Sequence, residues 1–199
     1  GLERGMQESN RIKANLVLCV IEKMNEHEAF ETVVAAKKYL RRGVCGLDLL
    51  LNESLYETET FDWLFDLIKE EHIPFTVHCG QYNTDSMKKA IRYGAQRISQ
   101  GLQIHMDEEL LNEIRDRRVI VECCPASNLK LGTVESYGSH PIRKLFDMGV
   151  PVCVCTDRLR VSGINLVKEY KNLARYLNFT PKELYKMNIN AIQGAFLNQ

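Results

Sequence analysis

The sequence of 199 residues has no excess charge of either sign and no long apolar run. Lys and Arg together number 26, as do Asp and Glu, so the formal net charge is zero. A general nucleic-acid binder or a protein of anionic membranes would show a basic excess or stripe. No apolar stretch approaches the roughly 20 residues that span a bilayer, and residues 1–10 are too polar for a signal peptide. We therefore expect neither nucleic acid nor a membrane as a partner.

The sequence also lacks a C-x-x-C motif, although it contains seven cysteines. Five of them, Cys19, Cys45, Cys123, Cys153 and Cys155, lie in apolar runs, where a thiol usually behaves as a small hydrophobic side chain. Free thiols are typical of reducing compartments, whereas disulfides are rare there. The cysteine pattern therefore favours a cytoplasmic location.

Short apolar runs alternate with longer amphipathic segments along the whole sequence. The apolar runs are nearly continuous, which is typical of strands buried on both faces. They cover residues 15–21, 44–51, 74–80, 96–100, 119–124 and 151–156. Helices are predicted over residues 2–13, 28–41, 61–71, 84–94, 107–117 and 140–148, with two more in 165–199 separated at Thr180–Pro181. The stretch 128–139, rich in Gly, Ser and Thr, is expected to be an irregular active-site or lid loop.

This alternation predicts a parallel α/β sheet with helices outside it. The composition, 45% hydrophobic and 26% charged, is that of a globular protein, and the length indicates a single domain over residues 1–199. A complete (β/α)8 TIM-type barrel has eight strands, whereas six βα units are recognisable here. We therefore expect an incomplete barrel with two open sheet edges. Either a second copy of the chain or a partner chain covers these edges, or the parent protein is longer than this chain.

Polar residues follow five consecutive predicted strands. In barrels of this kind, working residues lie at the carboxyl ends of the strands and in the loops after them. The polar clusters are Asp48 with Asn52–Glu53, then residues 78–81, 99–101, 127–128 and 156–158. Five clusters in register indicate one site at that end of the barrel.

These clusters carry a resemblance to a known family. The segments G-L-D-L-L-L-N-E (46–53), T-V-H-C-G-Q (76–81), R-I-S-Q-G (97–101), E-C-C-P-A-S-N (122–128) and V-C-T-D (154–157) follow one another in the chain. In order and spacing they resemble the motifs of the adenosine deaminases, G-[IL]-D-L-x-G-x-E, T-x-H-A-G-E, R-I-G-H-G, E-x-C-P-x-S-N and T-D-D-P. The resemblance implies a purine nucleoside deaminase barrel in which a zinc-activated water converts adenosine to inosine and ammonia.

The resemblance also implies where the metal ligands lie. His78 and Asp157 match two of the family's four zinc ligands, and the other two come from an H-x-H on an earlier strand that this sequence does not contain. A catalytic zinc usually has at least three protein ligands and a water. We therefore expect no zinc cofactor in this chain, and surface or capping roles for His27, His72, His105 and His140.

Four positions of the implied pocket depart from the family pattern. Gln81 stands where the family has its proton-donating Glu, and Gln100 where it has the His that positions or deprotonates the water. An amide can do neither at neutral pH. Arg158 replaces an Asp that contacts the purine, and Leu51 replaces a Gly. Since each acid–base group contributes about 10²–10⁴-fold, we expect a catalytically inactive chain.

Two other functions stay open at this point, and with them the question of whether the chain is an enzyme. A second polypeptide that supplied the H-x-H strands would complete the zinc site around His78 and Asp157. Alternatively, the chain is a metal-free binder of a purine nucleoside or nucleotide, with Arg158 attracting an anionic group.

Overall fold

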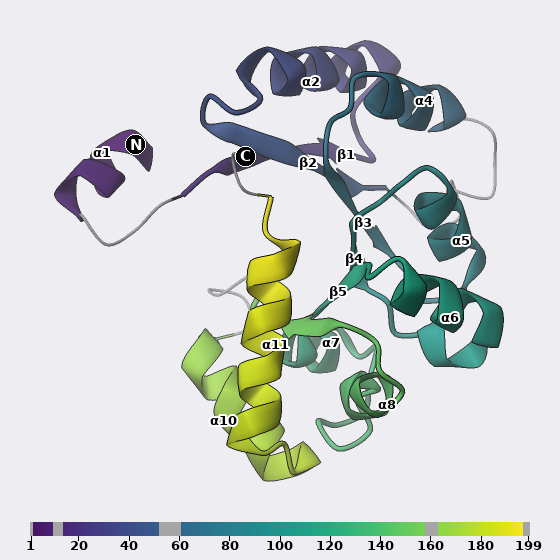
Figure 1. Cartoon of the computed structure of the whole chain (residues 1–199), viewed down its shortest axis with the longest axis vertical. Coiled ribbons are helices and arrows are strands. Elements are labelled where there is room, and N and C mark those ends of the chain that lie inside the picture. The colour runs from purple at the N-terminus through teal and green to yellow at the C-terminus, as the bar shows by residue number, and fades with distance from the viewer. Residues whose placement is uncertain (1, 10–13, 52–60, 158–162, 197–199) are drawn as a thin grey trace.

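The computed structural model describes residues 2–9, 14–51, 61–157 and 163–196, and within these ranges six strands form one parallel sheet. The strands follow the sheet in chain order: β1 (Leu16–Ile21), β2 (Val44–Leu50), β3 (Phe75–Cys79), β4 (Arg97–Gln100), β5 (Ile120–Cys123) and β6 (Val152–Val154). The sheet is curved, and most helices lie outside it (Figure 1). This arrangement confirms the predicted incomplete (β/α)8 barrel with six βα units.

The helices begin and end close to the predicted positions. They are α1 (Leu2–Glu8), α2 (Glu26–Tyr39), α4 (Asp62–Glu70), α5 (Asp85–Arg92), α6 (Glu108–Asp116), α7 (Pro125–Leu131), α8 (Ile142–Asp147), α10 (Leu166–Leu177) and α11 (Pro181–Gly194), with a short 3₁₀ turn at Ile104–Met106. In Figure 1, α2, α4, α5 and α6 follow the sheet along one side, whereas α10 and α11 lie at its β6 end. Within the described ranges, no helix combines the length and the apolar character needed to cross a bilayer.

Local side-chain chemistry explains where these helices begin. At the start of α2, Asn25 accepts a hydrogen bond from the Glu28 backbone N–H at 2.9 Å, and Glu28 accepts one from the Asn25 N–H at 2.9 Å. Thr180 and Glu183 form the same reciprocal capping box at α11, and Pro181 occupies the first helical position. The predicted break at Thr180–Pro181 is therefore confirmed.

The segment expected to be a loop at 128–139 is partly helical. Helix α7 continues through Leu131 and ends at Gly132, whose φ of 73° is left-handed. Pro125, which favours the first turn of a helix, nucleates it directly after β5. Asn128 therefore lies on a helix, and the prediction of an irregular loop was wrong for residues 128–131. The prediction of a helix over 2–13 holds for Leu2–Glu8, and residues 10–13 lie outside the described residues.

The core lies between the sheet and the surrounding helices. Outward-facing strand residues such as Leu49, Val77 and Ile98 are fully buried, as are Leu64 and Phe65 of α4. The inward-facing residues of β2 to β6 alternate with these, and they include the polar side chains described below. At the sheet edge, β1 is less covered: Leu16 is 48% and Ile21 38% exposed. Among the described strands, β1 and β6 each pair on one side alone.

Candidate active site

His78 and Asp48 meet at the carboxyl ends of β3 and β2. His78 Nε2 lies 3.2 Å from Asp48 Oδ2, and both side chains are about three-quarters buried. Burial opposes protonation of His78, but Asp48, with Glu122 and Asp157, outweighs it and raises the pKa of His78 above its usual value. The other Asp48 oxygen, Oδ1, is buried and has no hydrogen-bond partner among the described residues. The structure therefore holds His78 as a partner of a carboxylate.

Asp157, the second predicted metal ligand, follows β6. Its Oδ2 accepts a hydrogen bond of 2.6 Å from Ser127 Oγ on α7, and its φ is 49°. A left-handed conformation is uncommon for a residue other than glycine, although aspartate adopts it more readily than most. The hydrogen bond and the turn fix the carboxylate at the same end of the barrel as His78.

Gln100 is buried at the end of β4, with 9% exposed. Its Oε1 accepts a hydrogen bond of 2.5 Å from Asn128 Nδ2, and Asn128 Oδ1 lies 3.1 Å from His140 Nε2. The His140 Nδ1 in turn accepts the backbone N–H of Ile142 at 3.1 Å. The Gln100 amide therefore ends a chain of buried hydrogen bonds that begins at α8.

The structure corrects part of the prediction for His140. The prediction of a capping role is confirmed by its bond to the Ile142 N–H, but the alternative of a surface position is wrong, because His140 is 3% exposed. Burial alone lowers its pKa to about 4. The sequence signal that could have placed it inside was its position directly before Pro141 at a helix start, beside a buried apolar helix face.

Gln81 lies in the turn after β3, and its side chain is only partly buried. Its Nε2 donates a hydrogen bond of 2.8 Å to the Tyr82 hydroxyl, and its backbone carbonyl accepts one of 3.3 Å from Gln103 Nε2. Gly80 permits this turn, because its φ is 79° and a Cβ there would collide with Met87. The turn therefore presents Gln81 at the same end of the barrel as His78.

Leu51 and Arg158 are the two predicted substrate-contact positions, and of these two Leu51 lies among the described residues. Leu51 follows β2 and is 6% exposed, so its side chain belongs to the core cluster. Arg158 lies outside the described residues, as do Asn52 and Glu53. The structure thus brings His78, Asp157, Gln81 and Gln100 to one end of the barrel and leaves the predicted role of Arg158 as a prediction.

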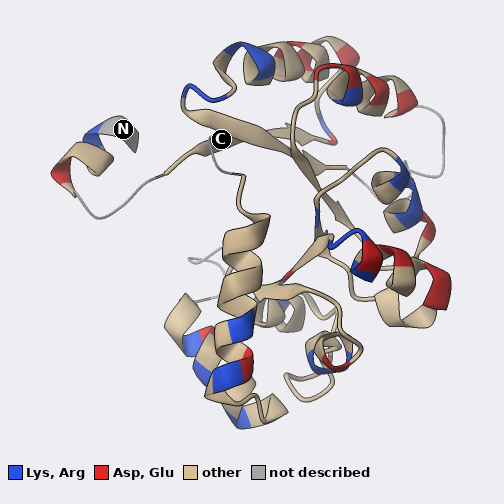
Figure 2. Cartoon of the chain, viewed as in Figure 1, with Lys and Arg blue, Asp and Glu red and all other residues tan. Residues whose placement is uncertain are grey.

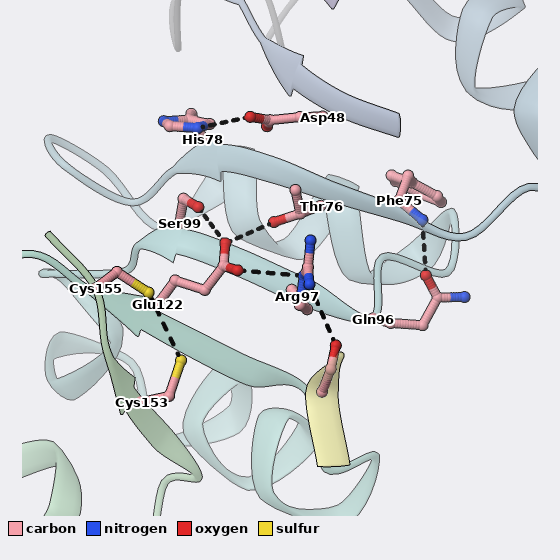
Figure 3. A network of polar contacts seen from close by, with 11 residues as sticks. Asp48, Phe75, Thr76, His78, Gln96, Arg97, Ser99, Glu122, Cys153 and Cys155 are labelled. Carbon is pink, nitrogen blue, oxygen red and sulfur yellow. Dashed lines mark hydrogen bonds and ion pairs between the residues drawn. The ribbon is translucent and has the colours of Figure 1, made fainter. Parts of the chain in front are cut away.

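A polar layer that sequence analysis missed lies inside the barrel below this site (Figure 3). Glu122 of β5 accepts hydrogen bonds from Ser99 Oγ and from Thr76 Oγ1 (3.1 Å), and it pairs with Arg97 Nε at 3.2 Å. Arg97 also donates to the Gly194 carbonyl at 3.3 Å. The sequence signal for this layer was the alternation of polar residues with apolar ones along the predicted strands. The layer links β3, β4 and β5 through side-chain hydrogen bonds and an ion pair directly below the site.

A cluster of thiols lies beside this layer. None of the seven cysteines forms a disulfide within the described residues, and the Sγ atoms of Cys153 and Cys155 are 4.0 Å apart. Hydrogen bonding with Cys124 and Cys153 lowers the pKa of Cys155, whereas the same contacts and burial raise the pKa values of Cys124 and Cys153. The interpretation of Cys153 as a small hydrophobic side chain fits its burial but omitted this contact.

The described donor set does not complete a zinc site. Nowhere in the described ranges do three or more His, Cys, Asp or Glu side chains converge in a way that could hold a metal ion. His78 and Asp157 therefore stand as two candidate ligands, each already engaged with a neighbouring side chain. These residues alone do not fit a catalytic zinc, which usually takes three protein ligands.

Comparison with known proteins connects this geometry to a family. The family model described as adenosine deaminase matches residues 1–199. The adenosine deaminase of Haemophilus ducreyi is 33% identical over 203 residues, which cover 100% of this chain and 59% of that protein. The chain thus spans a little over half the length of this relative.

Solved structures agree with the fold. The apo N6-methyl-AMP deaminase of Arabidopsis thaliana is 26% identical, with a TM-score of 0.81 over 92% of this chain and 54% of its own. A zinc-bound amidohydrolase from Burkholderia ambifaria has a TM-score of 0.88 over 98% of this chain and 55% of its own. At 20% identity, that second likeness supports the fold alone.

Proposed function

Because the chain belongs to the adenosine deaminase family, we propose that it keeps the deaminase scaffold but does not deaminate adenosine by itself. The strands, the turns after them and the carboxyl-end constellation of His78, Asp157, Ser127 and Asn128 are those of the family motifs. The side chains that carry proton transfer in the resemblance are replaced by amides. The chain is therefore an adenosine deaminase-like pseudoenzyme in this proposal.

The observation that carries the proposal is the state of Gln100. A catalytic base needs a lone pair that can take a proton near neutral pH, and an amide has none of that strength. Gln100 Oε1 is moreover occupied by Asn128 Nδ2 at 2.5 Å inside the core. The residue thus serves packing and hydrogen bonding at a position where the family motif carries a His.

The neighbouring positions support the same conclusion. Gln81 offers an amide where an acid is needed, and each such loss costs about 10²–10⁴-fold in rate. The zinc of the family would polarise a bound water into a nucleophile, but His78 and Asp157 provide two ligands where three are usual. We therefore propose no resident zinc in this chain, and no catalytic step through one.

Two alternatives have specific support. Two solved relatives, each 26% identical, are an ADAL–IMP complex and an Arabidopsis ADAL complexed with GMP, and Arg158 would suit the anionic group of such a purine nucleotide. Asp48 Oδ1 beside His78 is buried and has no hydrogen-bond partner in the described part of the chain. This oxygen supports the other alternative, in which a second polypeptide supplies the missing ligands and restores a hydrolase.

One experiment separates these functions. The purified chain, shown to be folded by circular dichroism, is incubated with adenosine and an equivalent of zinc while inosine is followed by absorbance. We expect no inosine above the zinc-only blank and no stoichiometric zinc after gel filtration. Inosine formation by the wild-type chain would overturn the proposal, and retained zinc would favour the completed-hydrolase alternative.

The control restores both side chains in the variant Gln81→Glu, Gln100→His. It is expected to stay inactive, because two ligands are still too few. Thermal melts of the same samples with inosine or IMP test the alternative function of a purine nucleotide binder. A ligand that raises the melting temperature of the wild type but not that of Arg158→Gln would support this alternative. An unchanged melting temperature would count against it.

A further inference from the structure

A cavity of about 830 Å³ opens at the amino ends of the strands, away from the motif residues. Its walls come from the turns that lead into β2, β3, β4 and β5, and residues 193–196, at the end of α11 and just beyond it, close one side. We call it the basal cavity. Its volume lies within the roughly 300–1,000 Å³ range of small-molecule sites.

The charge of the basal cavity is one-sided. Arg41, His72, Arg117 and Arg118 line it, and no acidic residue is among its described lining residues. Figure 2 shows basic residues in the turn that leads into β2 and in the turn between α6 and β5. Since the whole chain has a formal net charge of zero, this is a local concentration of positive charge.

Two of these arginines are not neutralised. Arg117 is engaged, because it pairs with Glu113 at 2.9 Å and donates to the Ile91 carbonyl at 2.9 Å. Arg118 Nη2 instead donates to a neutral partner, Gln193 Oε1, at 3.0 Å. Within the described part of the chain, neither Arg41 nor Arg118 forms an ion pair with an acidic residue. Both are exposed at the cavity rim, where they are free to receive an anion.

The backbone conformation at these positions is a second, independent reason to expect an anion site in the basal cavity. Arg41, His72 and Arg118 have φ values of 62°, 54° and 55°, which are left-handed. At the equivalent turns before β4 and β6 this conformation belongs to Gly94 and Gly149. A side chain there costs conformational energy that glycine avoids. Three basic side chains are thus kept where glycine would fold more easily, and all three line one cavity.

We propose that the basal cavity binds the phosphate group of a small organic phosphate. A guanidinium pairs with phosphate oxygens through two parallel hydrogen bonds, so Arg41 and Arg118 are the expected anchors. The lining also has an apolar part, with Leu40, Pro74 and Val119, against which an organic body could pack. This site is separate from the carboxyl-end site, and the proposal does not rest on the proposed function.

Isothermal titration of the full chain at low salt tests the proposal with three probes: AMP, inorganic phosphate and adenosine. We expect AMP to bind, phosphate to bind more weakly and to compete with it, and adenosine without phosphate not to bind at this site. Arg41→Gln and Arg118→Gln should each weaken AMP binding about tenfold or more, because each removes a charge-assisted pair. The control Arg175→Gln, an exposed arginine of α10 outside the cavity, should leave it unchanged.

A second pair of variants separates binding from folding. Arg41→Gly and Arg118→Gly relieve the left-handed backbone, so they should melt no lower than wild type while losing AMP affinity. AMP affinity that survives in all four cavity variants, or that Arg158→Gln removes instead, would place the nucleotide at the other end of the barrel and overturn the proposal. Absence of binding by the wild-type chain would overturn it as well.

Discussion

Buried hydrogen bonds determine the protonation state of His140. Its Nε2 faces Asn128 Oδ1 at 3.1 Å, and its Nδ1 accepts the Ile142 N–H at 3.1 Å. Because Asn128 uses its amide nitrogen to donate to Gln100, its oxygen is left to accept from the imidazole. One nitrogen must therefore carry the proton and the other must not, so the neutral ring fits the site and the charged ring does not.

Stability should depend on pH through His140. Its pKa falls from 6.5 to about 4 on folding, because burial disfavours the charged ring. The folded state therefore rejects a proton that the unfolded state accepts below pH 6.5. The contribution of neutral His140 to the free energy of unfolding is fully present above pH 6.5. It is lost as the pH falls toward 4, at up to about 1.4 kcal/mol per pH unit. Urea titrations at pH 7.5, 5.5 and 4.5 measure this loss.

The matched variant for this prediction is His140→Gln, which keeps a donor and an acceptor but does not titrate. The free energy of unfolding of the wild type should fall more steeply than that of His140→Gln between pH 6.5 and 4. Parallel profiles for the two proteins would contradict the prediction, since carboxylates elsewhere affect both equally.

Among the described helices, α11 contacts the edge strand β6 most extensively. Asn190 is 5% exposed, and its Nδ2 donates a hydrogen bond of 2.9 Å to the Val152 carbonyl. Strand β6 has three residues and a single strand neighbour among the described elements. A side chain from a helix therefore supplements the pairing of this strand, and it joins the carboxyl-terminal helices to the sheet.

Substitution within α11 tests this junction. Asn190→Ala should lower the free energy of unfolding by about 1–3 kcal/mol, because it leaves a buried carbonyl without its partner. Asn188→Ala is the control on the same helix: Asn188 accepts a hydrogen bond from Tyr170 at 2.5 Å, but this bond is exposed, so the change should be smaller. Equal losses in the two variants by urea denaturation would contradict the assigned role of Asn190.

At the scale of the whole molecule, the described sheet has two edge strands, β1 and β6. Edge strands expose unpaired backbone groups that readily pair with another chain. The β1 edge also exposes apolar side chains, with Leu16 at 48% and Ile21 at 38%. We propose that a second copy of the chain, or a partner chain, covers this edge.

Light scattering coupled to gel filtration tests this proposal. The wild-type chain should elute as a dimer or larger species, and Leu16→Lys with Ile21→Lys should shift it toward the monomer, because charges on an edge oppose strand pairing. Leu131→Lys, which alters a more exposed leucine on α7 (64%), is the control and should not change the mass. A wild-type monomer at all concentrations would be the contrary result.

The sequence by itself determined the order and type of the elements. Apolar runs such as the one ending at Leu51, caps such as Thr180 and the motifs after the strands are local signals, because periodicity and capping involve residues a few positions apart. Together they predicted six βα units, and they placed His78, Gln81, Gln100 and Asp157 at one end of the barrel. Helix α7 was missed, because its residues Ser127 and Asn128 favour turns as readily as helices.

Only the tertiary structure decided which side chains meet. The Gln100, Asn128 and His140 chain joins residues 28 and 12 positions apart, and the basal cavity joins four separate turns with segment 193–196. Contacts of this kind depend on how the strands curve and how the helices pack, which local spacing does not encode. The family scaffold was therefore readable in the sequence, whereas the engagement of Gln100 in the core and the basic cavity below the sheet required the fold.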